Sequence, residues 1–292
     1  MIGTDTGDDA QARVQAHTGG RGAHVIVLAG AVAVLIVGLL VAAAGPLLYR
    51  GGVLELDAAR EGTQSLAGML AGLAGAIALV GLAMSVLGKS SKGAIVGVLV
   101  IIAALLLGFR VVGAMVQRSG LPPIHDAQTD WDNPVAFTGR ALAGREADAA
   151  APVRDDARIG AGAGEDWAGM TFAEAQATFW ELEPLHLDMP PAAATVLADE
   201  VARRQGWSVM FSDPPGGQIE AVQRSFWYGL PADIAVRIVE AEGGSRVDVR
   251  STSRLAGNDM GANAQRIKVL LDDLAQTAAV RAAGATGATA TD

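Results

Sequence analysis

Cysteine is absent from the 292-residue sequence, and its absence removes several kinds of chemistry. A chain without cysteine forms no disulfide, offers no thiolate nucleophile and holds no Cys-ligated zinc or iron–sulfur cluster. The sequence also lacks a Gly-x-Ser-x-Gly elbow, a His-Glu-x-x-His pair and a lysine-bearing phosphate loop. We therefore expect no cofactor, and the familiar hydrolase and nucleotide-binding motifs are excluded.

Tryptophan is missing from the first 130 residues, and acidic residues are scarce there. All five tryptophans lie after residue 130. Residues 1–120 carry 8 basic and 6 acidic residues, whereas residues 121–292 carry 14 basic and 25 acidic residues. The chain therefore divides near residue 120. The second part, with a net charge of −11, repels polyphosphate, so nucleic acid is not an expected partner.

Long apolar runs occupy residues 24–116 and predict three transmembrane helices, at about 25–48, 65–87 and 93–116. The first run is long enough as a helix, about 36 Å, to cross a hydrocarbon core of about 30 Å. The spans hold no carboxylate and no histidine, and their one charge, Arg110, lies close to a helix end from which it reaches the headgroups. The lipid bilayer is thus an expected partner, and a transporter is disfavoured.

The short links between the spans predict the orientation. The link Lys89–Lys92 is basic without an acidic residue, whereas the link Tyr49–Gln64 has two basic residues against three acidic ones. The positive-inside rule then predicts a multi-pass protein of the inner membrane with a cytoplasmic N-terminus and a periplasmic C-terminal domain. Arg110 and Arg118 count against this orientation. Cleavage of the first span as a signal peptide is disfavoured, because its leader and its apolar run are both long.

Residues 121–279 predict a soluble α+β domain. Helices are expected at 192–205 and 258–279, and strands at 207–212, 218–227, 232–241 and 245–253. This order predicts an antiparallel sheet of about four strands packed by helices. Stretches without an apolar period predict a disordered tail at 1–23, a flexible insert at 138–169 and a second disordered tail at 280–292.

The hairpin around Gly243–Gly244 carries the most informative polar pattern. Because side chains alternate between the faces of a strand, Ile234, Val236 and Ile238 predict the core face. A turn centred on Gly243 and Gly244 sets Arg237 opposite Arg250 and Asp233 opposite Arg254. The other face then forms a candidate ligand-binding site with Arg246 nearby, and its members are Glu220, Arg237, Asp248, Arg250 and Arg254.

Two interpretations of this arginine-rich face remain open. Like charges placed opposite each other destabilise a sheet unless something compensates them. In the first interpretation, Asp248 and Glu220 bridge the guanidinium groups in a structural network. In the second, Arg237 and Arg250 bind an anion such as a lipid phosphate or a carboxylate, because paired guanidiniums suit bidentate recognition of oxyanions.

A second polar cluster lies in the segment 124–134, which offers one imidazole and three carboxylates before residue 133. His125, Asp126 and Asp130 form a candidate site for a hard cation, although the segment lacks the alternate spacing and central glycine of a calcium loop. Asp and Asn before Pro134 are also typical turn formers. A metal site and a simple turn are therefore both compatible with this segment.

An ordered series of motifs resembles the domain-of-unknown-function 1499 family over residues 122–275. The motifs are Pro123–Asp126, Thr129–Asp130, Asp132–Pro134, Pro184–Leu185, Pro190–Pro191, Gly206–Trp207, Ile219–Ala221, Gly244–Arg254, Asn258–Ala264 and Arg266–Ile267. The resemblance implies a bacterial envelope protein, often with an N-terminal membrane segment, and no assigned activity. Two positions depart from the family pattern: Ala232-Asp233 stands where two aspartates are usual, and Phe179-Trp180-Glu181 replaces a Tyr-Pro-Asp run.

These observations favour a membrane-anchored, non-enzymatic envelope module. Its extracytoplasmic domain is expected to bind a protein partner or an anionic, lipid-like ligand at the arginine-rich face. The alternative is an envelope enzyme, such as a metal-dependent hydrolase, that uses His125, Asp126 and Asp130.

Overall fold

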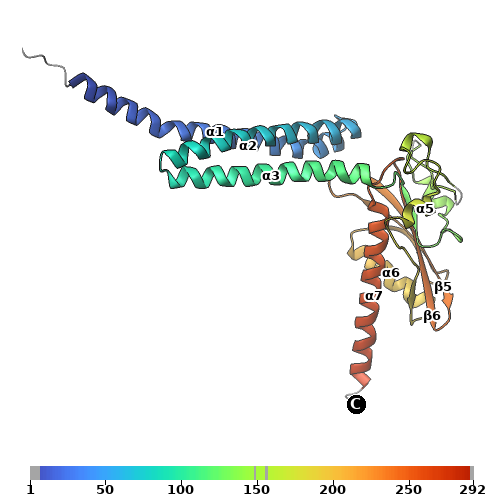
Figure 1. Ribbon diagram of the computed structural model, residues 1–292. Helices are drawn as coiled ribbons and strands as arrows, with labels where there is room; N and C mark the ends of the chain where they lie inside the picture. The colour runs from blue at the N-terminus through green and yellow to red at the C-terminus, as the bar shows by residue number, and fades with distance from the viewer. Residues whose placement is uncertain (1–6, 148, 155–156, 290–292) are drawn as a thin grey trace, which may run out of the picture. The chain divides into compact units, whose positions relative to one another are not determined.

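A computed structural model describes residues 7–147, 149–154 and 157–289, and the chain divides into two compact units, residues 1–116 and 117–292. Each unit is described by itself. The first consists of helices α1 (Gly7–Arg50), α2 (Thr63–Leu87) and α3 (Ser91–Gly120), with a short π-helix, η1 (Ala58–Gly62), before α2. Figure 1 shows the long helices of this unit.

Three helical segments are long and apolar enough to cross a membrane, namely Gly22–Arg50, Ala58–Leu87 and Ser91–Gly113. The prediction of three spans is confirmed, and the chain is a membrane protein. Helix α1 starts at Gly7, before the expected start of the first span near residue 25. Most of the tail predicted over residues 1–23 is therefore helical. Residues 1–6 of that predicted tail lie outside the described residues.

Small side chains form the seam between the three membrane helices. Ala31, Ala74 and Ala104 are buried there, one from each helix. Gly97 fits closely, since an added Cβ would lie 3.0 Å from the Cβ of Leu82. Large apolar side chains such as Leu40 and Ile102 remain exposed on the outside. This distribution is typical of helices in lipid, where close backbone packing rather than burial of large side chains holds the bundle together.

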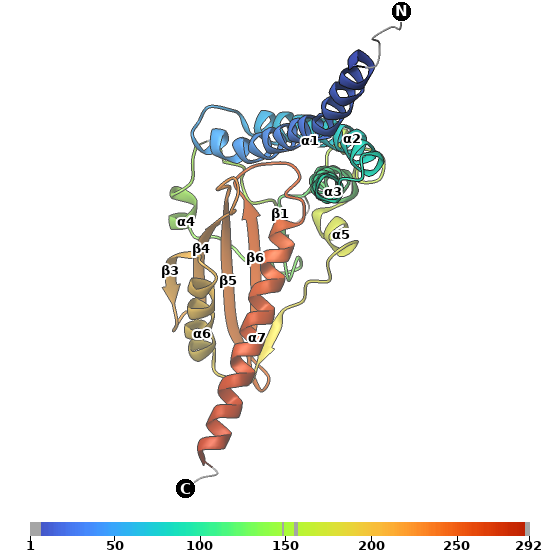
Figure 2. The ribbon, with the colours of Figure 1, turned by 90° about the vertical axis from the view of Figure 1, so that its left-hand side faces the viewer.

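The second unit is an antiparallel sheet of six strands with helices on one face (Figure 2). The strands follow the order β1-β6-β5-β4-β3, and β2 also pairs with β6. Their bounds are β1 Asp126–Gln128, β2 Leu185–Leu187, β3 Ser208–Asp213, β4 Gln218–Arg224, β5 Pro231–Ala241 and β6 Gly244–Ser253. The α+β prediction is confirmed, but the sheet is larger than the four strands expected.

Strands β1 and β2 account for the difference. Each has only three residues, too few to show an alternating pattern in the sequence. They lie one after the other along the same edge of β6, because β1 pairs with residues 250–252 and β2 with residues 245–247. Tertiary pairing, rather than local sequence preference, makes these segments strands.

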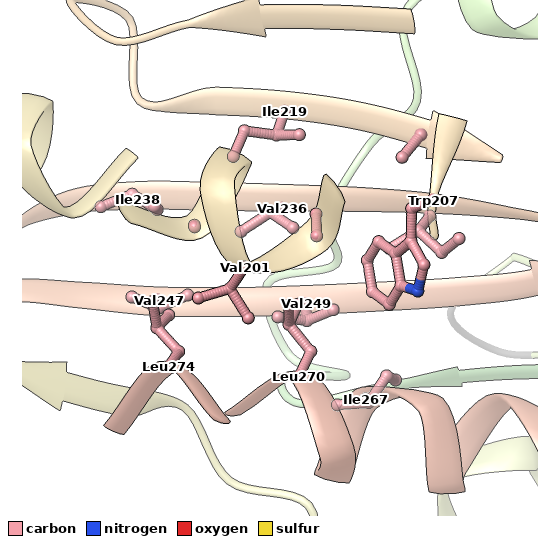
Figure 3. Close-up of a cluster of buried hydrophobic side chains, with 14 of the residues drawn as sticks. Val201, Trp207, Ile219, Val236, Ile238, Val247, Val249, Ile267, Leu270 and Leu274 are labelled. Atoms are coloured by element: carbon pink, nitrogen blue, oxygen red, sulfur yellow. The ribbon is translucent and has the colours of Figure 1, made fainter. Parts of the chain in front are cut away.

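One face of the sheet packs on helices α6 (Pro191–Arg204) and α7 (Ala262–Thr289). Figure 3 shows Val236 and Val249 from the strands facing Val201 of α6 and Leu270 of α7. The alternation of β5 and β6 puts these apolar residues on one side, and the apolar stripe of α7 meets them. Helix α7 continues to Thr289, through most of the tail predicted at 280–292, whose last three residues lie outside the described residues.

The segment between β1 and β2 contains α4 (Gly139–Ala143), the 3-10 helix η2 (Ala161–Ala163) and α5 (Phe172–Ala177). Ile159 is buried with Ile124 and Phe172 in a small second core. The segment therefore has local structure within the stretch 138–169 that was expected to be a flexible insert, where residues 148, 155 and 156 are not described.

Candidate functional site

The face of the sheet opposite α6 and α7 carries polar and charged side chains from four strands, β1, β4, β5 and β6. Successive side chains of a strand point to opposite faces. Val247 and Val249 of β6 face the helices, so the side chains between them lie on the other face. We call this surface the arginine face; its members are Asp126, Gln128, Glu220, Asp233, Arg237, Arg246, Asp248, Arg250 and Arg254. All five candidate ligand-binding residues from the sequence therefore lie on one face, as their parity predicted.

The predicted pairing between β5 and β6 was wrong by two residues. Arg237 lies opposite Asp248, and Arg250 lies opposite Ala235, so the two arginines do not face each other. The strands turn at Glu242 and Gly243, and Gly244 already belongs to β6. Gly244 is needed for close strand approach, since an added Cβ would lie 2.1 Å from the carbonyl oxygen of Leu187 in β2. The sequence reasoning centred the turn on Gly243 and Gly244, and the inclusion of Gly244 in β6 accounts for the register error.

Arg250 is paired within the arginine face by a buried carboxylate. Its Nε donates to Oδ1 of Asp126 at 3.0 Å and its Nη2 donates to Oδ2 at 2.8 Å. The remaining donors reach the carbonyl oxygens of Val135 at 3.3 Å and Val153 at 2.7 Å, and the guanidinium lies over the ring of Phe137. Asp126 also accepts from the amide of Val153 at 3.0 Å. With 5% of its surface exposed, Arg250 has little access to a solute.

Arg254 and Asp233 form a second buried pair. Arg254 Nη2 donates to Asp233 Oδ1 at 2.8 Å, and its Nη1 donates to Glu146 Oε2 at 2.8 Å. Arg145 Nε lies 2.9 Å from the other oxygen of Asp233. The hydrogen bonds that Arg254 donates to Asp233 raise the pKa of Arg254. A hydrogen bond from the backbone amide of Glu146 itself, followed by the one from Arg254, lowers the pKa of Glu146. Two acidic and two basic side chains therefore compensate one another here.

Asp248 holds two arginines at once. Its Oδ2 accepts from Arg237 Nη2 at 3.1 Å, and its Oδ1 accepts from Arg246 Nη2 at 2.9 Å. Arg246 also donates to Asp130. Burial alone would raise the pKa of Asp130, but hydrogen bonds from the amide of Asn133 and from Arg246 outweigh it and hold that pKa below its ordinary value. The buried carboxylate thus fixes both guanidinium groups in place.

Glu220 does not bridge the arginines, contrary to the structural-network interpretation. Its two carboxylate oxygens accept from the amide and, at 2.6 Å, from the hydroxyl of Thr138. Thr138 is also the N-cap of α4, because its Oγ1 accepts from the amide of Ala141. Glu220 therefore attaches the start of α4 to the sheet.

A segment without regular strands closes most of the arginine face. We call it the cover segment, residues 129–147 and 149–154. It meets the face largely through its backbone: the carbonyls of Asn133, Val135 and Val153 accept from arginines, and the amide of Val135 donates to Gln128 Oε1 at 3.2 Å. Sequence reasoning missed Thr138, Arg145 and Glu146 in this network. The Thr138-Gly139 step before a short helix is an N-cap signal that was available.

Among the described members of the arginine face, the two at one edge, Arg237 and Arg246, reach solvent. The side chains of Arg237 and Arg246 are 25% and 33% exposed. His186, opposite Arg246 on β2, and Val239, opposite Arg246 on β5, are exposed beside them. We call these four residues the open margin. It is the part of the predicted site that a ligand can contact.

The candidate metal residues are not brought together. His125 packs edge-on against Phe172 with ring centroids 5.4 Å apart, Asp126 pairs with Arg250, and Asp130 pairs with Arg246 and accepts from the amides of Asp132 and Asn133. Burial lowers the pKa of His125. Within the part of the chain that the structure describes, no group of three or more His, Asp or Glu side chains could hold a metal ion. The turn interpretation accounts for Asp130.

Comparison with curated proteins and with solved structures finds no match to this chain. The family model for a protein of unknown function (DUF1499) matches residues 127–274, which is about half of the chain and includes the sheet, α6 and most of the arginine face. The resemblance carried by the motifs of the sheet is thereby confirmed, and the chain belongs to the DUF1499 family.

Proposed function

We propose that the protein is a non-enzymatic module of the cell envelope that works by binding. In this proposal three helices hold it in the inner membrane with the N-terminus in the cytoplasm. The α+β domain then lies on the extracytoplasmic side and binds a partner protein or an anionic, lipid-like ligand. The basic link Lys89–Lys92 supports the orientation.

The open margin is the binding surface in this proposal, and one observation carries it. Asp248 is buried and holds Arg237 and Arg246 side by side, each with part of its side chain exposed to solvent. Arginine side chains fixed in this way lose little conformational freedom on binding, and their planar forks match carboxylate or phosphate oxygens. Arg250 and Arg254, by contrast, are buried and paired, so they support the sheet rather than the ligand.

A complementation experiment with the full chain tests the proposal. The double variant Arg237→Ala/Arg246→Ala is expressed in a deletion strain with a measurable envelope defect. We expect it to reach wild-type levels in the membrane and to fail to restore the phenotype. The matched control Arg203→Ala/Arg204→Ala removes two exposed arginines from α6 and is expected to restore it. Full complementation by the first variant would refute binding at the open margin.

The side of the membrane is tested independently by reporters fused after Asp292. Alkaline phosphatase is active only outside the cytoplasm, and green fluorescent protein exported in unfolded form does not fluoresce there. We expect an active phosphatase fusion and a dark fluorescent-protein fusion. The opposite pair of results would place the domain in the cytoplasm and overturn the envelope assignment.

A further inference from the structure

The turn between β4 and β5 exposes a pair of large aromatic side chains. Phe226 is 83% exposed and Trp227 is 60% exposed, and their rings pack edge-on with centroids 5.2 Å apart. We call residues 224–230 the aromatic turn. Its sequence, Arg-Ser-Phe-Trp-Tyr-Gly-Leu, holds three of the chain's 13 aromatic residues in succession and no acidic residue. Exposed aromatic side chains that lie together, rather than singly, indicate a contact surface.

The aromatic turn is a defined loop rather than a frayed end. The amide of Ser225 donates to the carbonyl of Leu230 at 2.9 Å, and the amide of Leu230 donates back to Ser225 Oγ at 3.0 Å. Arg224 Nη1 donates to the carbonyl of Gly229 at 3.1 Å. These bonds hold the base of the turn, so the two rings project from a fixed position.

Hydrogen bonds across the sheet place this turn at the end where the chain enters the domain. Leu121, the residue after α3, accepts at its carbonyl from Asn258 Nδ2, and the carbonyl of His125 accepts from the amide of Ser253 at the end of β6. The amide of Arg254 donates to Pro231, the first residue of β5, next to the aromatic turn. The entry point and the turn thus share one end of the sheet, about 15 Å apart across three strand spacings.

The short stretch of chain between the third membrane-crossing segment and the domain limits how far this end of the sheet can lie from the bilayer. Only seven helical residues separate Gly113, the end of the third membrane-crossing segment, from Leu121, and the eight steps along the chain give a rise of about 12 Å. The interfacial layer on each side of the hydrocarbon core is about 5–8 Å thick. Leu121 therefore lies within about 12 Å of the end of that segment, which keeps the aromatic turn within reach of the interfacial layer.

The charged residues of the domain are distributed differently at the two ends of the sheet. At the opposite end of the strands, where β3 joins β4 and β5 joins β6, the turns and flanking positions are acidic, with Asp188, Asp213, Glu240 and Glu242. The entry end presents Arg224, the aromatic turn and the exposed Leu255, and its exposed carboxylate, Glu146, is paired with Arg254. An anionic bilayer therefore repels the acidic end of the sheet more strongly than the entry end.

We propose that the aromatic turn is a second membrane contact, in which Phe226 and Trp227 insert into the interfacial layer of the bilayer. Trp and Tyr are enriched at this level because an apolar ring with a polar atom suits a half-wet environment. The contact restricts how the domain tilts on its tether and leaves the open margin, toward the acidic end, facing the aqueous phase. It does not depend on which side of the membrane the domain occupies.

The absence of cysteine allows a direct test in the intact protein. The full chain is reconstituted in nanodiscs of phosphatidylethanolamine and phosphatidylglycerol, with one environment-sensitive fluorophore attached to Phe226→Cys or, as the matched control, to Glu242→Cys. We expect doxyl-labelled lipid to quench the label at position 226 and aqueous iodide to quench the label at position 242. Equal quenching of both labels by iodide would overturn the proposal.

A second measurement removes any bias from an apolar label. In nanodiscs of brominated lipid, the unlabelled wild-type chain is expected to lose part of its tryptophan emission. The variant Trp227→Tyr, which keeps an aromatic side chain, is expected to lose a smaller fraction. The same fractional quenching in both proteins would show that Trp227 does not meet lipid. Neither outcome bears on Arg237 and Arg246, so binding at the open margin stands or falls separately.

Discussion

The two faces of the sheet use the same strands but are closed in different ways. One face is covered by α6 and α7, and apolar side chains such as Val249 and Leu270 meet there. The arginine face is covered by the cover segment, and its contacts are ion pairs and hydrogen bonds to backbone groups, as at Arg250 and Thr138. An apolar face can be covered by any element with a matching stripe. A charged face needs a partner for each charge.

This difference determines which substitutions each face of the sheet tolerates. Truncation of an apolar side chain leaves a cavity, and its neighbours relax partly into it. Loss of one member of a buried ion pair leaves the other charged and without water. We therefore expect the arginine face to be at least as sensitive to single substitutions as the core, although it was the face first considered for ligand binding.

The largest effect is expected for Arg250→Ala. It leaves Asp126 buried without its guanidinium partner and frees the carbonyls of Val135 and Val153, so unfolding should become easier by about 3–5 kcal/mol. Tryptophan fluorescence of the full chain in detergent micelles measures this during denaturant unfolding, because all five tryptophans lie in the domain. The double variant Asp126→Leu/Arg250→Met is the control and should recover much of the loss. An unchanged midpoint for Arg250→Ala would contradict the pairing.

Leu270→Ala probes the apolar face by the same method. Leu270 is fully buried between α7 and the sheet, and its truncation is expected to cost about 2–5 kcal/mol. Val269→Ala, one residue away on the exposed side of α7, should shift the midpoint far less. If both variants unfold alike, α7 does not pack on the sheet as described.

Thr138→Ala is expected to have an intermediate effect of about 1–2 kcal/mol, because it removes the cap of α4 and one hydrogen bond to the buried Glu220. Thr171 also caps a helix, α5, but its cap hydrogen bonds are exposed, whereas those of Thr138 are partly buried. Thr171→Ala should therefore cost less than Thr138→Ala in the same unfolding experiment. The reverse order would show that the Glu220 contact contributes little.

The smallest effect concerns acid pH. The pKa of Asp130 is lower in the folded chain than its ordinary value, so its contribution to stability is present above the unfolded pKa, about 3.9, and is lost as pH falls through the folded pKa. Asp130→Asn should therefore flatten the fall in stability on the acid side of that value. Parallel pH profiles for the two proteins would show that the Asp130–Arg246 pair does not form.

The sequence predicted the apolar face far better than the arginine face. Three spans, α6, α7 and the four longer strands follow from runs and periods of apolar residues. The parity of β5 and β6 also follows from alternation, so Arg237 and Arg250 were assigned to the correct face. The pairing of these two residues was predicted wrongly, because Gly244 lies inside β6 and not in the turn. There the carbonyl of Leu187, in the three-residue strand β2, leaves no room for a side chain.

The cover segment escaped prediction for a physical reason. Its residues are mostly small or polar and show no apolar period, which is also typical of flexible loops. Its attachment comes from backbone groups, such as the carbonyls of Val135 and Val153, and every residue type carries these. Partners on the strands, such as Asp126, Glu220 and Arg250, give the segment its place.

Hydrogen exchange of the full chain in nanodiscs tests most directly whether the cover segment closes the arginine face. The amides of Val135, Thr138 and Val153 donate to Gln128, Glu220 and Asp126 of the sheet. We expect these amides to exchange orders of magnitude more slowly than an unstructured chain, and Arg250→Met to accelerate exchange at Val153. Exchange at unstructured rates in the wild type would contradict the account and return Arg250 and Arg254 to the ligand-binding candidates.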